Sequence, residues 1–302
     1  MNAHHENVHY QNPFLCLKIW EIVCPKLDKR QEAASPDQSH PHWHYHKEVE
    51  FLLILQGEME VVVPEERWTV RTGEVALLGS SQLHYTRQLS RELNYLVFQV
   101  DLSAHFDQSV VMYWSLFREQ LQPLSSLNYI LQENDDVKRQ VAEAIRNIYE
   151  EVNRREKGYE ISVSLLVKTI ILQLVRGDCR NVMQYERGEQ FQVIEPVLTY
   201  VDRHLSEKLT VEEASRLINL SYHHFIRTFK KAVGLSFTEY VNLKRVQKAE
   251  QLLLTEKMSV EEIAYAVGIP NRAHFHEMFK RRHGCSPNQF KNRLQPGAVH
   301  EA

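Results

Sequence analysis

The amino-acid sequence predicts a multidomain α+β protein, in which a β-barrel and the helices that follow it precede an all-α C-terminal domain. Three observations support this fold class. Short apolar runs separated by turn residues occupy positions 14–101, helical periodicity begins near residue 106, and the last hundred residues contain a duplicated segment. A chain of 302 residues is long enough to bury a core in each of two domains.

The composition is that of an ordinary globular protein, with 43% hydrophobic and 25% charged residues. No apolar run approaches the roughly 20 residues that span a bilayer, and the first residues lack the features of a secretory signal. The four cysteines (Cys16, Cys24, Cys179 and Cys285) do not have the spacing of a thiolate zinc site or a disulfide framework. We therefore expect a cytoplasmic protein with no membrane partner.

Residues 1–104 are predicted to form the barrel. Loose alternation, continuous apolar runs and glycine turns indicate strands at Phe14–Cys24, Val49–Leu55, Met59–Val63, Val75–Leu78 and Leu93–Val100. Several short strands this close together are typical of a barrel or a sandwich.

Residues 105–180 are predicted to be helical. An apolar stripe marks residues 135–156, and Ile161–Leu174 forms a second, more apolar helix. These helices either pack on the barrel or form a dimer interface, and the sequence leaves both open because one stripe does not reveal what covers it. Residues 181–191 lose the periodicity and are predicted to be an interdomain linker.

The strongest signal is an internal repeat within the C-terminal domain, residues 192–295. Residues 210–240 match residues 259–290 at an offset of 49 before a turn and 50 after it. Thr210 and Ser259 are predicted N-caps, each with a glutamate three residues later that completes a capping box. Asn219 and Gly268 suit the turn that follows each short helix. Each copy therefore has the pattern of a helix-turn-helix.

The second helix of each copy places a phenylalanine pair on one face, Phe225 with Phe229 and Phe275 with Phe279. Basic side chains stand opposite, as in helices that enter the major groove. We expect base contacts from His223, Arg227, Arg272 and His276, and phosphate contacts from Lys230, Lys231, Lys280, Arg281 and Arg282. The alternative, two amphipathic helices with solvated basic faces, does not explain why caps, turn and basic face repeat in register.

Residues 237–254 are predicted to form one helix between the two copies. A stiff helix suits two recognition helices that must lie about one DNA turn, ~34 Å, apart. Residues 191–295 contain 16 Lys and Arg against 11 Asp and Glu, a net charge of +5 on an otherwise acidic chain. This excess is too small for a nucleoid protein that binds through backbone charge alone.

The C-terminal third resembles the DNA-binding domain of the AraC/XylS family of transcription activators. The resemblance is carried by residues 244–253, by 263–268, and by 275–280 with Gly284, Ser286 and Pro287. It implies a homodimer that binds double-stranded DNA and contacts RNA polymerase. Three positions depart from the family pattern: Ile269, Cys285 and Glu277, of which the last brings a carboxylate where a basic or polar residue is common.

A histidine cluster occupies residues 40–50, HPHWHYHKEVE, where His44, His46 and Glu50 share one strand face by the period of two. With Gly57 this spacing resembles the first cupin motif, and Gly73, Gly79 and His84 resemble the second. In metal-binding cupins the positions of His44, His46, Glu50 and His84 hold a divalent ion such as Zn, Mn, Fe or Ni. Two alternatives remain, a metal-free ligand pocket, which we favour, and a solvated loop from His40 to His46.

The predicted effector pocket combines polar groups with an aromatic wall, a combination that suits a sugar or a similar polar metabolite. Its candidate residues are Trp20, Trp43, His44, His46, Glu50, His84 and Tyr85. The sequence thus predicts a ligand-responsive transcription regulator, an activator rather than an enzyme. The alternative is a metal-dependent cupin enzyme that carries a DNA-binding tail. No nucleophilic triad, phosphate loop or dinucleotide fingerprint is present.

Overall fold

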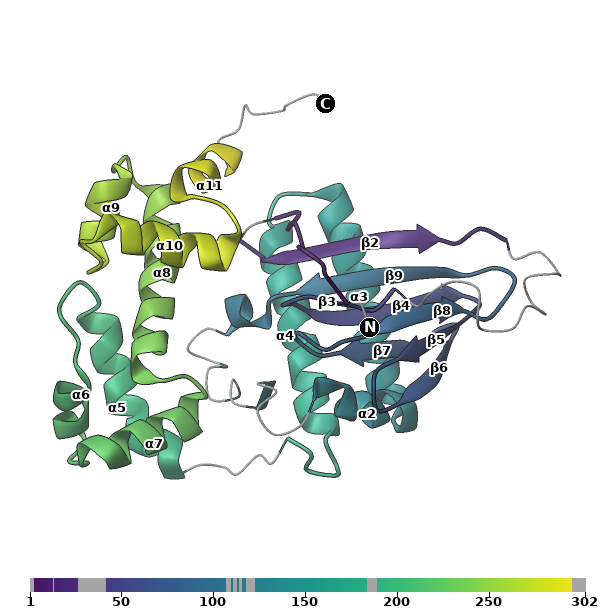
Figure 1. The fold of residues 1–302 in the computed structure, drawn as a ribbon, viewed down its shortest axis with the longest axis horizontal. Coiled ribbons are helices and arrows are strands. Elements are labelled where there is room, and N and C mark those ends of the chain that lie inside the picture. The colour runs from purple at the N-terminus through teal and green to yellow at the C-terminus, as the bar shows by residue number, and fades with distance from the viewer. Residues whose placement is uncertain are drawn as a thin grey trace. The chain divides into compact units, whose positions relative to one another are not determined.

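The computed structural model describes residues 3–12, 14–26, 42–106, 110, 113, 116–117, 123–183 and 189–294. The chain divides into two compact units. The N-terminal unit contains residues 1–107 and 117–185, and the C-terminal unit is built on residues 186–302 (Figure 1). Among the described residues, all the strands lie in the N-terminal unit and the C-terminal unit is helical, so the predicted multidomain α+β fold is confirmed. Residues 184–188 of the predicted linker and Gln295 lie outside the described residues.

Two sheets face each other in the N-terminal unit. The strands are β1 (His4–His5), β2 (Leu17–Val23), β3 (His44–Tyr45), β4 (Val49–Gln56), β5 (Glu58–Val62), β6 (Arg67–Arg71), β7 (Val75–Leu78), β8 (Tyr85–Gln88) and β9 (Asn94–Val100). A four-stranded antiparallel sheet has the order β2-β9-β4-β7, and a three-stranded antiparallel sheet has the order β6-β5-β8. β1 pairs with β3 in parallel. The sequence did not predict β6 and β8, which are short and partly exposed.

Alternation along β4 and β9 gives the larger sheet two buried faces. Leu52 and Ile54 point between the sheets, where they join Met59 and Val61 of β5 in one apolar cluster. Phe51 of β4 and its neighbour on β9 point the other way, with their rings stacked. Because both faces are covered, β4 is the continuous apolar run seen in the sequence.

Helices cover the outer face of the four-stranded sheet. The N-terminal unit contains η1 (Leu102–His105), η3 (Leu124–Leu127), α2 (Asn128–Glu133), α3 (Asp135–Arg154) and α4 (Tyr159–Gly177). α3 packs against α4 and also contacts β2 and β7, the two edge strands of the sheet (Figure 1). The predicted stripe of α3 is buried along its whole length. On α4, by contrast, Ile161, Leu165 and Leu172 are 68%, 60% and 41% exposed.

The C-terminal unit consists of two similar groups of helices joined by α8 (Figure 1). Its helices are α5 (Glu189–Arg203), α6 (Val211–Leu217), α7 (Tyr222–Val233), α8 (Phe237–Thr255), α9 (Val260–Ala266), α10 (Arg272–His283) and α11 (Pro287–Leu294). Both predicted capping boxes are present, at Thr210 and at Ser259. The turns after α6 and α9 place Asn219 and Gly268 in the left-handed region, at φ 55° and 77°. The two helix-turn-helix motifs are thereby confirmed.

None of the helices in the described parts of the chain combines the length and the apolar character required to cross a membrane.

Candidate functional site

The two helix-turn-helix units superpose in register along the second helix. Residues 221–230 and 271–280 have the same sequence of buried, intermediate and exposed positions. Phe225 and Phe229 are fully buried in the first unit, as are Phe275 and Phe279 in the second. The side chain of Ser221 accepts a hydrogen bond from an amide of the first turn, and Asn271 does the same one unit later. An offset of 50 therefore identifies equivalent positions on α7 and α10.

The outward face of α7 is cationic. His223, Arg227, Lys230 and Lys231 are all exposed on it. Within the described residues, neither Arg227 nor Lys230 forms an ion pair with a carboxylate, and α7 itself contains no acidic residue. Arg227 and Lys230 can therefore attract an anionic backbone without first breaking an ion pair within the protein.

The outward face of α10 is mixed in charge. The guanidinium of Arg272 lies 3.0 Å from Oε1 of Glu261, and that of Arg281 lies 3.0 Å from Oε1 of Glu277. Lys280 is exposed at the position equivalent to Lys230. Glu277 occupies the position equivalent to Arg227, so the second unit presents a carboxylate where the first presents a guanidinium.

Two of the predicted DNA contacts are placed differently from the expectation. His276 is equivalent to Ile226, is only half-exposed, and has its Nε2 enclosed without a hydrogen-bond partner among the described residues. Arg282 is equivalent to Ala232, has a side chain only 10% exposed, and donates from Nε to Glu250. Both positions lie at the inner edge of α10, because the helical period turns them toward α8 and α9.

Arg282 belongs to a buried ionic cluster. Oε1 of Glu250 on α8 lies 2.8 Å from Nε of Arg282 and 2.7 Å from Nε2 of His283. Burial raises the pKa of the Glu250 carboxyl, but the hydrogen bond from His283 and the charge of Arg282 outweigh it and lower that pKa overall. The equivalent positions in the first unit are Val201, Ala232 and Val233, which belong to one apolar cluster. The first unit thus fills this space with apolar side chains, and the second unit fills it with ionic ones.

A specific junction holds the two helix-turn-helix units together. Arg245 of α8 donates to the carbonyl oxygens of Leu205 and Glu207, at 3.1 and 2.6 Å, just beyond the end of α5. Gly268 approaches the same place so closely that a Cβ atom would lie 2.7 Å from the Leu205 oxygen. The 19 residues of α8 span about 28 Å at 1.5 Å per residue. This length agrees with the predicted stiff connection.

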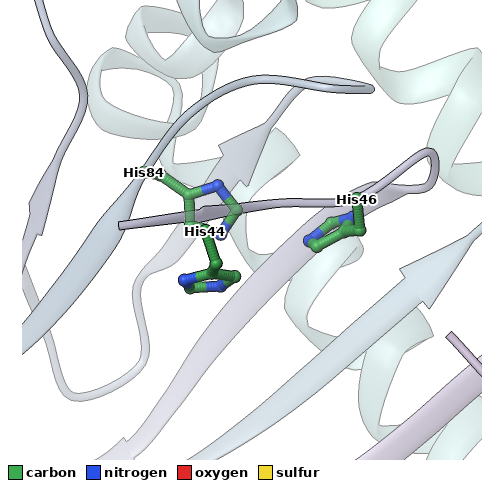
Figure 2. A group of neighbouring side chains, drawn as sticks. All are labelled: His44, His46 and His84. Carbon is green, nitrogen blue, oxygen red and sulfur yellow. The ribbon is translucent and has the colours of Figure 1, made fainter. Parts of the chain in front are cut away.

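The barrel brings three histidines together at one end (Figure 2). The backbones of His44 and His84 exchange two hydrogen bonds of 3.0 Å, which set their rings 4.2 Å apart. The His46 ring lies 5.3 Å from that of His84. One nitrogen from each ring falls within 4.8 Å of the others, and His46 and His84 are fully buried.

Each ring is oriented through the same nitrogen. Nδ1 of His44, His46 and His84 lies 3.1, 3.0 and 2.8 Å from a backbone carbonyl oxygen, that of His42, Glu48 and Gln82 respectively. A carbonyl only accepts, so each Nδ1 carries its proton and donates. A ring that is neutral then has its lone pair on Nε2, whereas His46, which also donates from Nε2 to Glu50, carries both protons. Such orientation by a backbone carbonyl is usual for histidines that bind a metal.

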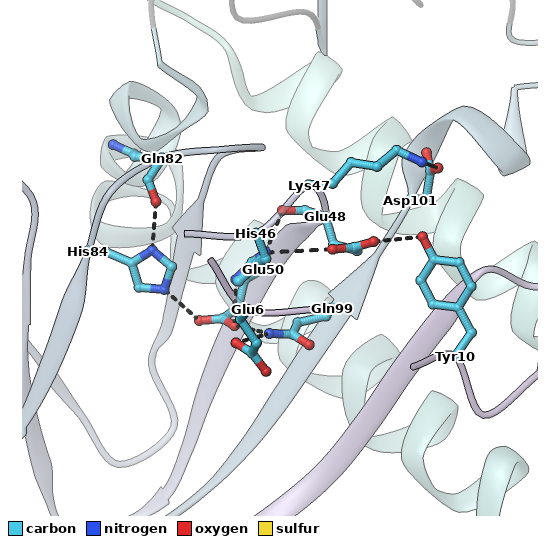
Figure 3. A network of polar contacts seen from close by, with 10 residues as sticks. All are labelled: Glu6, Tyr10, His46, Lys47, Glu48, Glu50, Gln82, His84, Gln99 and Asp101. Carbon is cyan, nitrogen blue, oxygen red and sulfur yellow. Dashed lines mark hydrogen bonds and ion pairs between the residues drawn. The ribbon is translucent and has the colours of Figure 1, made fainter. Parts of the chain in front are cut away.

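Glu50 lies at the centre of this cluster (Figure 3). Its Oε2 accepts hydrogen bonds from Nε2 of His46 at 3.1 Å and from the side chain of Gln99 at 2.9 Å. Nε2 of His84 lies 3.5 Å from Oε1, at ion-pair distance but without hydrogen-bonding geometry. Burial raises the pKa of the Glu50 carboxyl, and the two histidines lower it by more, so it stays ionised. Burial lowers the pKa of His46, but its hydrogen bond to Glu50 outweighs this and raises it overall.

The sequence prediction missed two members of the cluster. Gln99 pairs directly with Glu50 across β4 and β9, and Glu6 of the N-terminal segment reaches the side chain of Gln99 at 3.4 Å. The signal for Gln99 was a single polar residue at an inward position of an otherwise apolar strand. No sequence signal places Glu6, because only the pairing of β1 with β3 brings it near.

The other predicted effector residues lie apart from the four central ones. Trp43 packs edge-on against Tyr85, with ring centroids 4.7 Å apart. Trp20 packs against the apolar cluster between the sheets, with the ammonium of Lys18 over its ring at 3.9 Å. His40 lies outside the described residues.

Ion pairs and hydrogen bonds extend the polar network from the cluster toward the N-terminal segment (Figure 3). The hydroxyl of Tyr10 donates to Glu48 at 2.6 Å, and Lys47 contacts Asp101 at 2.6 Å. Burial and the nearby carboxylates raise the pKa of Tyr10, which keeps its proton for this bond. The N-terminal segment is thereby tied to the strand that carries the histidines.

Comparison with known proteins places a domain family on each unit. Residues 214–293 match a helix-turn-helix domain family, and residues 32–98 match a cupin domain family. The chain is 24% identical to the HTH-type transcriptional regulator YdeC of Bacillus subtilis (strain 168), over 82% of this chain and 85% of YdeC. It is 22% identical to the HTH-type transcriptional activator RhaS of Escherichia coli O1:K1 / APEC, over 82% of this chain and 86% of RhaS.

Among solved structures, the chain is similar to the DNA-binding domain of AdpA in complex with a target DNA. The identity is 27%, the similarity covers 33% of this chain and 90% of that one, and the TM-score is 0.32.

Proposed function

We propose that this chain switches transcription when a small polar metabolite enters its barrel. The chain belongs to the AraC family of transcriptional regulators and carries an N-terminal cupin domain. The observation that carries the DNA-binding part is the repeated helix-turn-helix, with the same pattern of burial over residues 221–230 and 271–280. On α7, Arg227 and Lys230 have no carboxylate partner among the described residues. A solvated face would not require two copies held in register by caps, turns and a junction.

The proposed division of labour follows the geometry. His223 and Arg227 of α7, with Arg272 of α10, reach base edges in the major groove. Lys230, Lys231, Lys280 and Arg281 bind phosphates, because they lie toward the C-terminal ends of the two helices.

Selection of bound sequences from random duplex DNA tests this proposal. The wild-type chain should select a site with two half-sites, and Arg227→Ala should weaken binding by about 1–3 kcal/mol and relax preference at one position. Arg146→Ala, an exposed arginine on α3, is the matched control and should change nothing. Failure of the wild-type chain to enrich any sequence would refute the DNA-reading role. An equal loss by Arg227→Ala on every duplex would make Arg227 a phosphate contact only.

A second copy of the chain is the proposed partner for the exposed face of α4. A two-fold antiparallel pairing sets Leu165 against Leu172 of the partner subunit, and it sets the acidic start of α4 against the basic end of the partner's helix. Leu165→Lys should convert a dimer to a monomer in sedimentation, whereas Val23→Lys, at an equally exposed apolar position elsewhere, should not. A monomeric wild-type chain at high concentration, with and without DNA, would refute the pairing.

Activation is proposed to require contact with RNA polymerase. Transcription in vitro from a template that carries the selected site tests it. The chain should raise the yield of transcript when the effector is added, and a fall in yield would indicate a repressor.

The effector is proposed to bind where His44, His46, Glu50 and His84 converge. Several fixed hydrogen-bonding groups that converge on one place favour a sugar or a similar polar metabolite. A thermal-shift screen against a metabolite library should find polar ligands that stabilise the wild-type chain. The variant His84→Gln should lose the response. Hits only among apolar compounds would refute this ligand class.

A divalent metal at the same cluster is the second candidate, favoured by the three rings held through Nδ1. The Nε2 atoms of His44, His46 and His84, with a Glu50 oxygen, would hold it, and the ion would supply Lewis-acid chemistry. Elemental analysis of untagged protein distinguishes the candidates. Stoichiometric metal that is lost in His84→Gln supports the metal site, and metal-free protein that still binds effector supports the pocket. Turnover of the bound compound would be required for the enzyme alternative.

A further inference from the structure

Because the two helix-turn-helix units are duplicated, each position of α10 can be compared with the equivalent position of α7. On the outward face of α7 the order is His223, Arg227, Lys230 and Lys231. At the offset of 50, α10 has Ala273, Glu277, Lys280 and Arg281. The phosphate-facing pair is cationic in both units. The difference is confined to the two positions nearer the start of the helix, where a histidine and an arginine are replaced by a small side chain and a carboxylate.

The Glu277 carboxylate is accessible and held in place. Its side chain is 66% exposed, and its Oε1 pairs with Arg281 one turn later. The remaining cations of α10 are also balanced locally, Arg272 by Glu261 and Arg282 by Glu250, which leaves Lys280 without a carboxylate partner among the described residues. At these positions α7 therefore has two cations without a carboxylate partner among the described residues, Arg227 and Lys230, and α10 has one.

A carboxylate in the major groove has a narrow choice of partners. It only accepts hydrogen bonds, and it repels phosphate oxygens and the acceptor atoms O6 and N7 of guanine. The amino group N4 of cytosine is the donor that suits it, as described for glutamate and aspartate in base readout. A helix with Ala273 next to this carboxylate has room for a base edge to approach.

We propose that Glu277 is the specificity-determining residue of the second helix-turn-helix unit, where it accepts a hydrogen bond from cytosine N4 and opposes other bases at that position. The first unit supplies most of the electrostatic affinity through α7. This inference rests on the proposed DNA-binding function.

Three versions of the full chain test it by selection from random duplexes and by titration of the selected and a scrambled duplex. Glu277→Gln keeps the length of the side chain and removes its charge. It should bind the scrambled duplex about 3–10-fold more tightly and bind the selected duplex no better, so the specificity ratio falls. Glu277→Arg restores the residue type of the first unit and should replace the cytosine preference by guanine on that strand. Glu256→Gln, an exposed carboxylate at the end of α8, should behave as wild type.

The outcomes separate the two claims. If the wild-type chain selects no sequence, the proposed function fails and this inference fails with it. A second outcome is that the wild-type chain selects a site, but Glu277→Gln keeps the same base at every position and gains affinity equally on both duplexes. Glu277 then only repels the DNA, so the inference is overturned while the proposed function stands. Loss of the cytosine preference at one position, with the rest of the site unchanged, supports it.

Discussion

The second helix-turn-helix unit encloses a carboxylate and two basic side chains where the first unit encloses three apolar ones. Glu250, Arg282 and His283 have side chains 15%, 10% and 0% exposed. Two changes probe this cluster in opposite directions. Glu250→Ala removes the shared partner and leaves both bases, whereas the triple change Glu250→Val, Arg282→Met and His283→Val gives the cluster the apolar character of the first unit at similar volume.

The magnitudes follow from the contacts. Glu250→Ala breaks two hydrogen bonds to a charged group, each worth about 1.5–3 kcal/mol, and leaves the Arg282 guanidinium without its carboxylate. Loss of one partner of a buried pair costs about 3–5 kcal/mol. The triple change removes the desolvation penalty of all three groups, and replacement of a buried ionic cluster by apolar side chains of similar volume is neutral or stabilising by about 1–4 kcal/mol.

Amide hydrogen exchange measures both effects in one molecule. Peptides from α9 and α10 should exchange about a hundredfold or more faster in Glu250→Ala, at tenfold per 1.4 kcal/mol. They should exchange no faster than wild type in the triple variant. Peptides from α6 and α7 are the internal control and should respond less, and Glu256→Ala is the control variant on α8. Faster exchange of α10 in the triple variant would refute the reasoning, as would an unchanged rate in Glu250→Ala.

Three further outcomes are expected. The pKa of Glu250 is lowered in the folded state, so its contribution to stability is present at pH values above the ordinary pKa of 4.5 and is lost as the pH falls through the folded pKa. Acid titration followed by circular dichroism should show a transition that the triple variant lacks. Gly268→Ala should lower the free energy of unfolding by about 1–3 kcal/mol, because φ is +77° and the Cβ would collide with the Leu205 carbonyl. Asn219→Gly should lower it by almost nothing in the same thermal unfolding experiment, and equal effects of the two changes would contradict this reasoning. Ser81→Gly should stabilise the barrel by up to about 1 kcal/mol, because Ser81 has φ 59°. Tryptophan fluorescence follows its unfolding, since Trp20, Trp43 and Trp68 belong to the N-terminal unit, and a lower melting temperature would count against this prediction.

Local chemistry explains which predictions were confirmed. Caps, turn residues and phenylalanine pairs act over three to five residues, so their spacing in the chain is also their spacing in space. The helix-turn-helix units, with Thr210 and Ser259 as caps, could therefore be found directly. The sequence placed His44, His46 and Glu50 on one strand, but the structure has a bend at Lys47 and Glu48 between β3 and β4, so the three side chains meet across that bend.

Predictions that depended on a neighbour elsewhere in the chain were less complete. β6 and β8 are polar on one side and have too little apolar alternation to stand out. His276 and Arg282 have the composition of a basic face, but α8 and α9 pack against that side of α10. A basic residue at one position of a helix is exposed to solvent, whereas a basic residue at a nearby position is covered by a neighbouring helix. Only the packing of that neighbouring helix decides between the two outcomes.

The sequence by itself determined the two-part fold and the duplication, because both are encoded in short-range periodicity. The four central barrel residues were identified through the resemblance to the cupin motifs. Tertiary structure alone decided that Gln99 and Glu6 join Glu50 and that Arg282 turns inward to Glu250. These contacts join segments from 32 to 93 residues apart. Such contacts are set by how the elements bury their apolar faces, which no local pattern records.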